Sequence, residues 1–139
     1  RIEGHGTVVC FEPLGPIDSD FINSAAESLH IVKTVDHPAL QIQLDAKALV
    51  ENDEACVETV KAMAGHLVHF HANEPKLAIL GSSGLVDHAA LGEMLYAASY
   101  GGYVSIEQRM SSAEGCIDDI RRSVRVLRDS YLPRRMKAI

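Results

Sequence analysis

Short apolar runs alternate along this chain with longer segments in which apolar residues recur every three or four positions. The short runs are rich in residues that favour β-structure, and they predict four strands at residues 8–11, 40–44, 67–70 and 103–106. The longer segments have the period of amphipathic helices, so each can lay one apolar face on a sheet. Their apolar sets are Ala25/Leu29/Val32, Val57/Val60/Met63, Leu91/Leu95/Ala98 and Ile117/Ile120/Val124/Leu127.

Helix-start signals precede three of these segments. Ser24 and Ser111 each stand three residues before a glutamate, the spacing of a capping box, and Asp87 is the expected N-cap of the third helix. The resulting order of elements is βαβαβαβα. Because a strand, a helix and a second strand form a right-handed crossover, this order predicts an α/β fold with a parallel sheet.

Each predicted strand ends beside a side chain that can bind a metal ion. These side chains are Glu12, Asp45, His71 and Glu107, in chain order. Strand-end carboxylates are also common helix caps or solvated residues, and only the agreement of all four positions favours a site. The carboxyl ends of parallel strands lie on one side of a sheet, so the four groups are expected to converge. Three carboxylates and one imidazole suit Mn²⁺, Mg²⁺, Co²⁺ or Zn²⁺.

Composition narrows the classes of partner. The 139 residues are 47% hydrophobic and 23% charged, which predicts a single domain over residues 1–139. A net charge of −6 disfavours nucleic acid, and no apolar run reaches the roughly 18 residues that span a membrane. Cys10, Cys56 and Cys116 are odd in number and widely spaced, as expected of reduced thiols in a cytoplasmic protein.

Four segments around the strand ends resemble the xylose isomerase-like superfamily of sugar phosphate isomerases and epimerases. They read FEPLGP at 11–16, QLDAKA at 43–48, HFHANE at 69–74 and GGYVSIE at 101–107. Residues 81–87 are similar to the family's Gly-rich loop before its seventh helix. The resemblance implies a (β/α)₈ TIM barrel, of which this chain would supply strands five to eight, the C-terminal half.

The resemblance also implies a mechanism. Glu12, Asp45, His71 and Glu107 would bind one divalent metal ion, and Glu12 and Glu107 would also be the catalytic acid and base. A metal ion that holds adjacent carbonyl and hydroxyl oxygens of an open sugar acidifies the carbon-bound hydrogen and stabilises an enediolate. One glutamate would remove that proton and the other would return one, which isomerises or epimerises a sugar or sugar phosphate.

Four further residues are candidate substrate contacts: Lys47, His69, Glu74 and Arg109. Lys47 would stabilise an oxyanion or simply be solvated. His69 shares a strand face with His71, so it would contact substrate or fill a structural position facing inward. Arg109 would bind a sugar oxygen or phosphate, or form a salt bridge within its loop.

Two features of the family's sugar epimerases are missing. Ala48 stands where a histidine often follows the sixth-strand aspartate, and only Lys76 stands near the position of a common arginine. These differences favour, as an alternative, a metal-dependent lyase or hydrolase that cleaves 3-keto-glycosides after enolisation. DNA cleavage is disfavoured, because the extra metal-binding histidines and the basic charge of nuclease relatives are absent from the sequence.

Four βα units cannot close an eight-stranded barrel, so two sheet edges would stay unpaired. A missing N-terminal half could pair with both edges, a second copy could complete a pseudo-barrel, or the units could rearrange into a flavodoxin-like open sheet. The start at Arg1 is expected of a processed chain or a fragment. A further hypothesis is therefore a catalytically inactive fragment that folds only by association.

Overall fold

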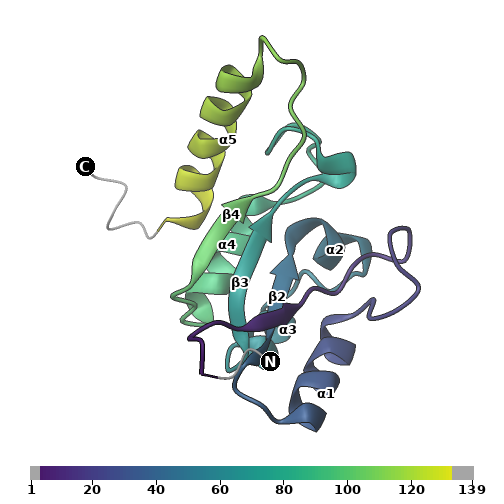
Figure 1. The fold of residues 1–139 in the computed structure, drawn as a ribbon. Helices are drawn as coiled ribbons and strands as arrows, with labels where there is room; N and C mark the ends of the chain where they lie inside the picture. Colours follow the sequence, from purple (N-terminus) through teal and green to yellow (C-terminus); the bar gives the residue numbers. More distant parts are fainter. Residues whose placement is uncertain (1–3, 133–139) are drawn as a thin grey trace.

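The four strands of the chain form one parallel sheet, described over residues 4–132 by a computed structural model. They are β1 (Val9–Phe11), β2 (Leu40–Asp45), β3 (Leu67–Ala72) and β4 (Tyr103–Ile106), paired in chain order (Figure 1). Consecutive pairing is the arrangement of a barrel segment, whereas an open doubly wound sheet reverses its strand order at a switch point. The predicted half-barrel is confirmed, and the flavodoxin-like rearrangement is wrong for the described residues.

Helices cover one face of the sheet, and in Figure 1 α3 and α4 lie behind it. The longer helices are α1 (Ala25–Val35), α3 (Val57–Met63), α4 (His88–Ala97) and α5 (Cys116–Tyr131). α1 packs against β2 and α3, while α4 packs against both α3 and α5. Two short elements stand at the carboxyl ends of strands, α2 (Ala46–Glu51) after β2 and the 3₁₀ turn η1 (Pro75–Leu77) after β3. The longer helices form the single outer layer of a barrel wall.

The two faces of the sheet differ in chemistry because side chains alternate along a strand. Ile42, Leu44 and Phe70 are fully buried in the core shared with the helices. Truncating a core residue such as Phe70 to alanine would cost about 3–5 kcal/mol. Gln43 and His71 occupy the alternate positions and lie on the opposite, polar face. This polar face is the one that carries the candidate chemistry.

Two of the three predicted helix starts are correct. Ser24 and Glu27 form the complete capping box of α1, and the Asp87 side chain accepts from Ala90 N at 2.9 Å to begin α4. The third is wrong, because α5 begins at Cys116 with no side-chain cap. Ser111 instead donates through both its amide and its hydroxyl to Asp119 inside α5.

The apolar stripe of α5 does not face the core, contrary to its predicted role. Ile117, Ile120 and Val124 are 56%, 42% and 40% exposed, while Asp119 and Ser123 are buried. The polar side turns inward because it bonds the loop after β4, where the Ser123 hydroxyl reaches Gln108 and Asp119 reaches Ser111. An exposed apolar stripe is therefore left beside the last strand of the sheet.

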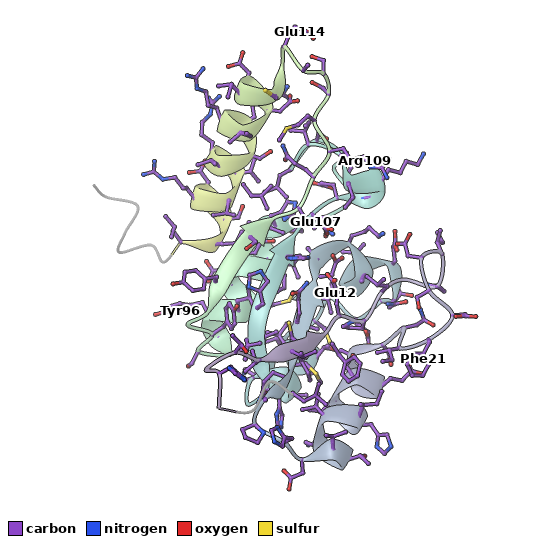
Figure 2. All side chains as sticks on the ribbon, viewed as in Figure 1. Glu12, Phe21, Tyr96, Glu107, Arg109 and Glu114 are labelled. Atoms are coloured by element: carbon purple, nitrogen blue, oxygen red, sulfur yellow. The ribbon has the colours of Figure 1, made fainter. Side chains whose placement is uncertain are left out.

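Both outer strands have a free edge. Val8 and Val9 at the β1 edge are 48% and 49% exposed, and Tyr103 at the β4 edge is 81% exposed. Figure 2 shows Phe21 on the α1 side of the sheet and Tyr96 on the other side, and these two are also largely exposed. Among residues 4–132, no helix has the length and apolar character to cross a membrane.

Candidate metal centre

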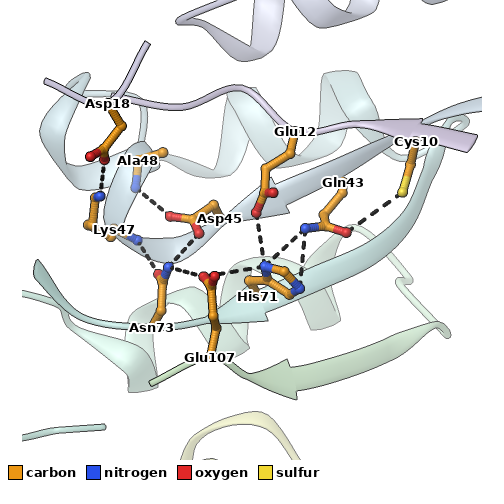
Figure 3. Close-up of polar contacts among 10 residues, drawn as sticks. All are labelled: Cys10, Glu12, Asp18, Gln43, Asp45, Lys47, Ala48, His71, Asn73 and Glu107. Atoms are coloured by element: carbon orange, nitrogen blue, oxygen red, sulfur yellow. Dashed lines mark hydrogen bonds and ion pairs between the residues drawn. The ribbon is translucent and has the colours of Figure 1, made fainter. Parts of the chain in front are cut away.

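Four side chains converge at the carboxyl ends of the four strands. Asp45 is the last residue of β2, His71 lies one residue before the end of β3, and Glu12 and Glu107 directly follow β1 and β4. One ligand atom from each of these residues lies within 4.8 Å of those of the other three (Figure 3). Parallel pairing in consecutive order produces this convergence, because each strand delivers its last polar side chain to the same end of the sheet.

His71 occupies the middle of the cluster. Its Nδ1 lies 2.9 Å from Glu12 Oε1 and 3.5 Å from Glu107 Oε2, so the imidazole faces carboxylates from both outer strands. The amide nitrogen of Gln43 lies 3.0 Å from the same Nδ1, and the Gln43 oxygen lies 3.7 Å from Cys10 Sγ. These neighbours fix the plane of the ring, as partners outside a metal's own ligand set commonly do.

Asp45 is the most buried member of the cluster, with 2% of its surface exposed. Its Oδ1 accepts from Ala48 N at 2.8 Å, which makes Asp45 the N-cap of α2, and its Oδ2 accepts from Asn73. Burial, together with the nearby Glu12 and Glu107 carboxylates, raises the pKa of Asp45 to about 6. Asp45 is thus a carboxylate that burial and two neighbouring carboxylates make harder to ionise.

This donor set fits a divalent cation. A bound cation would favour the ionised form of Asp45, whose pKa is raised first by burial and then by the Glu12 and Glu107 carboxylates. Carboxylate oxygens with one imidazole nitrogen match the preferences of Mn²⁺, Co²⁺, Mg²⁺ and Zn²⁺. Figure 3 shows Glu12 and Glu107 meeting at the same ring nitrogen of His71. The arrangement can therefore hold a cation between carboxylates that come from both outer strands.

The family is decided by the match of nearly the whole chain to one family model. Residues 1–130 match the model described as xylose isomerase-like TIM barrel. The chain belongs to this family. Four parallel strands in consecutive order, each followed by helical structure, are half of the barrel that the family name describes.

Several proteins that are similar to this chain are named as sugar epimerases. The chain is 28% identical over 105 residues to D-psicose 3-epimerase of Ruminiclostridium cellulolyticum, covering 76% of this chain and 36% of that protein. The structure of 3-keto-D-glucoside 4-epimerase from E. coli is 30% identical with a TM-score of 0.79, covering 89% of this chain and 46% of that one. The structure of an L-ribulose 3-epimerase shares the fold with a TM-score of 0.76 at 21% identity, and the match covers 96% of this chain and 50% of that one. The chain thus spans half or less of the length of these family members.

Of the predicted substrate contacts, Lys47 and His69 lie next to the cluster. Lys47 is the second residue of α2, two residues after Asp45, and its ammonium pairs with Asp18 from the loop after β1. Burial lowers the Lys47 pKa, but the hydrogen bond to Asp18 and the Glu51 carboxylate raise it overall. The His69 ring stands edge-on to His71 at 5.2 Å, and burial followed by the His71 charge lowers the His69 pKa.

Glu74 and Arg109 lie elsewhere. Glu74 is completely buried, and its carboxylate accepts from Gly81 N and the Ser83 hydroxyl and bonds the ring of His88. Its prediction as a substrate contact is corrected, because every one of these contacts holds the loop between β3 and α4 and none faces the cluster. Arg109 is exposed, and its backbone amide donates to Leu77 O, which places this residue beside η1 (Figure 2).

Two residues of the centre were not predicted from the sequence, Gln43 and Asn73. Gln43 lies two residues before Asp45 on the same strand face, and strand alternation alone could have found it. Asn73 follows β3 directly and bonds both Asp45 and Glu107. No spacing rule marks Asn73, because its contacts depend on where three strand ends meet in space.

Proposed function

We propose that these residues form the metal-binding and acid/base half of a divalent-metal-dependent sugar epimerase. The observation that carries this proposal is the convergence of Glu12, Asp45, His71 and Glu107 within 4.8 Å at the ends of four consecutive parallel strands. Similarity to D-psicose 3-epimerase and to 3-keto-D-glucoside 4-epimerase supports a sugar substrate that carries a ketone.

In this proposal the two glutamates move the proton. A divalent ion, when bound, would act as a Lewis acid on the oxygens of the substrate. One of Glu12 and Glu107, as carboxylate, takes the proton from the carbon beside the ketone, and the C–H electron pair moves toward the carbonyl oxygen. The other glutamate, protonated at the outset, gives its proton to the opposite face of the same carbon. That carbon is inverted and no atom is gained or lost.

The positions of the two glutamates support the assignment of one as the base and the other as the acid. Glu12 follows β1 and Glu107 follows β4, so the two carboxylates reach the cluster from the two outer strands of the sheet. Two carboxylates on opposite sides of a substrate are what inversion requires, because a single base would return the proton to the face from which it came. Lys47 and His69 flank this space and are the proposed contacts for substrate hydroxyls or a developing oxyanion.

The test is proton exchange by the complete gene product. The protein would be supplied with Mn²⁺ in deuterated water and given D-psicose, L-ribulose, D-tagatose and a 3-keto-glucoside, with deuterium incorporation followed by NMR. We expect deuterium beside the ketone of one substrate together with appearance of its epimer. Absence of exchange with every keto sugar, from protein that has bound Mn²⁺, would reject the proposed epimerase.

A second candidate is cleavage of 3-keto-glycosides, favoured by the 30% identity to a 3-keto-D-glucoside epimerase. Removal of the proton at C2, beside the ketone, leaves an electron pair that can expel the oxygen at C1. The leaving alcohol takes up a proton and the sugar keeps a C1–C2 double bond. Release of the free alcohol from a 3-keto-glucoside, without accumulation of a C4 epimer, would identify this lyase activity.

We also propose that the catalytic form includes a complementary half-barrel of four βα units. The chain covers 49%, 46% and 50% of three structurally similar epimerases, and both of its outer strands have a free edge. Beside β4 an open groove of about 880 Å³ is lined by Tyr96, Tyr100, Leu127 and Tyr131. This groove and the exposed stripe of Ile117, Ile120 and Val124 lie along the edge where the next βα unit of a barrel would pack.

A further inference from the structure

We infer that Asn73 is the positioning residue of the centre, which orients Asp45 and Glu107 for the metal ion. The inference rests on the proposed function and adds a residue outside the predicted ligand set. Asn73 is 1% exposed and directly follows β3. It therefore stands between the ends of β2 and β4, the two strands that deliver the carboxylates it contacts.

Both the nitrogen and the oxygen of the Asn73 side-chain amide form hydrogen bonds. Its Nδ2 donates to Asp45 Oδ2 and, at 2.9 Å, to Glu107 Oε2, while its Oδ1 accepts from Lys47 N at 2.9 Å (Figure 3). An amide nitrogen has two protons, so these contacts give one to each carboxylate. One side chain thereby connects the carboxyl ends of β2, β3 and β4.

Only one orientation of this amide satisfies its neighbours. Rotation by half a turn would place Oδ1 against two carboxylates and Nδ2 against the Lys47 N–H, which exchanges three hydrogen bonds for three repulsive contacts. An aspartate at this position would likewise present an acceptor to two acceptors. An asparagine side chain can donate two hydrogen bonds to the carboxylates and accept one from the Lys47 amide, whereas an aspartate of the same size cannot.

These bonds restrain both carboxylates before any ion arrives. Asp45 is held at Oδ1 by Ala48 N and at Oδ2 by Asn73, whereas Glu107 is exposed enough to rotate without the Asn73 bond. Fixing ligands in advance reduces the entropy that binding must remove, and outer partners of metal ligands commonly contribute about 10- to 100-fold in metal affinity. The donated protons also reduce the repulsion between the two carboxylates.

The experiment compares Mn²⁺ affinity in variants of the full chain, with free Mn²⁺ counted by electron paramagnetic resonance. Asn73→Ala is expected to weaken binding by about 10- to 100-fold, and Asn73→Ser, which retains one donor, by a smaller factor. The control is Asn23→Ala, since Asn23 Nδ2 also donates two hydrogen bonds, to Leu14 O and Ser19 O in the loop after β1. The control is expected to lose stability without losing affinity.

The positioning role of Asn73 and the proposed epimerase function can be rejected by different experimental results. Wild-type affinity in folded Asn73→Ala would overturn the positioning role, since a purely structural asparagine affects stability alone. Should Asn73→Ala fail to fold, Asn73→Ser decides the question by the same measurement, and wild-type affinity in that variant overturns the inference. Absence of proton exchange by wild-type protein that binds Mn²⁺ would reject the epimerase while leaving the affinity comparison valid.

Discussion

His71 Nδ1 lies 2.9 Å from Glu12 Oε1, which links two strands that are not neighbours in the sheet. β2 separates β1 from β3, so Glu12 reaches across an intervening strand to meet the imidazole. The contact depends on the register of all three strands, because a slip of one residue would turn a side chain to the opposite face. Integrity of the centre is therefore a sensitive measure of whether the half-barrel is correctly paired.

Divalent metal is expected to raise the thermal stability of the protein through this centre. A ligand at 100 times its dissociation constant stabilises the folded state by about 2.7 kcal/mol, provided that the unfolded chain does not bind it. Mn²⁺ should therefore raise the midpoint of thermal unfolding, and Asp45→Ala should abolish the increase, because Asp45 is the buried member of the proposed ligand set. Differential scanning fluorimetry with and without a chelator measures both.

The control for this experiment is Asp20→Ala. Asp20 is an exposed aspartate in the loop after β1 and is outside the cluster. This variant should respond to Mn²⁺ as the wild-type protein does. A full response retained by Asp45→Ala would show that Asp45 is not a ligand.

Glu107→Gln is expected to stop exchange of the substrate C–H proton with deuterated water in the complete protein. The amide can neither take up nor deliver that proton, and loss of a general acid or base lowers rates by about 10²- to 10⁴-fold. Glu12→Gln should have an effect of similar size on epimer formation. Glu114→Gln is the matched control, since Glu114 is exposed before α5, far from Glu107 (Figure 2). Exchange at the wild-type rate in Glu107→Gln would remove this residue from the acid/base pair.

The metal-free protein should lose stability as pH rises through the range from about 4 to above 6. Burial raises the pKa of Asp45 from 3.8 to about 6, so in this range the folded state binds a proton that the unfolded chain has released. Stability therefore falls with pH, by up to about 3 kcal/mol, instead of rising as for a salt-bridged aspartate. Chemical denaturation at several pH values measures this slope, and Asp45→Asn should flatten it. An equally steep slope in Asp45→Asn would assign the titration to another group.

The sheet was predictable from the sequence because its signals are local. Each strand is a short apolar run, and the capping box at Ser24 and the N-cap at Asp87 lie within the residues that they cap. The short helix α2 was missed because its N-cap, Asp45, is also the last residue of a strand. The capping box predicted at Ser111 does not form, because Ser111 donates instead to the Asp119 carboxylate, eight residues away.

The centre was predictable as far as strand order determines it. Glu12, Asp45, His71 and Glu107 each end a strand, and parallel pairing brings strand ends together without further information. The contacts of Asn73 with the cluster, and the position of Glu74 away from it, could be recognised only in the folded structure. These two neighbours in sequence turn in different directions, Asn73 toward the carboxylates and Glu74 toward His88, and only the backbone path after β3 decides which one faces the centre.

The exposed stripe on α5 provides the test of the complementary half-barrel. Ile120→Asp should abolish co-purification of residues 1–139 with a separately expressed N-terminal half of the parent protein, because it places a charge in the apolar contact proposed for the next βα unit. The same substitution should change the stability of the chain alone by no more than about 0.5 kcal/mol, since the site is on its surface. Arg125→Asp, at an exposed polar position of the same helix outside the apolar stripe, is the control and should leave association intact. Light scattering distinguishes the alternatives, since a stable homodimer of wild-type residues 1–139 that persists when the other half is supplied would contradict the proposed partner.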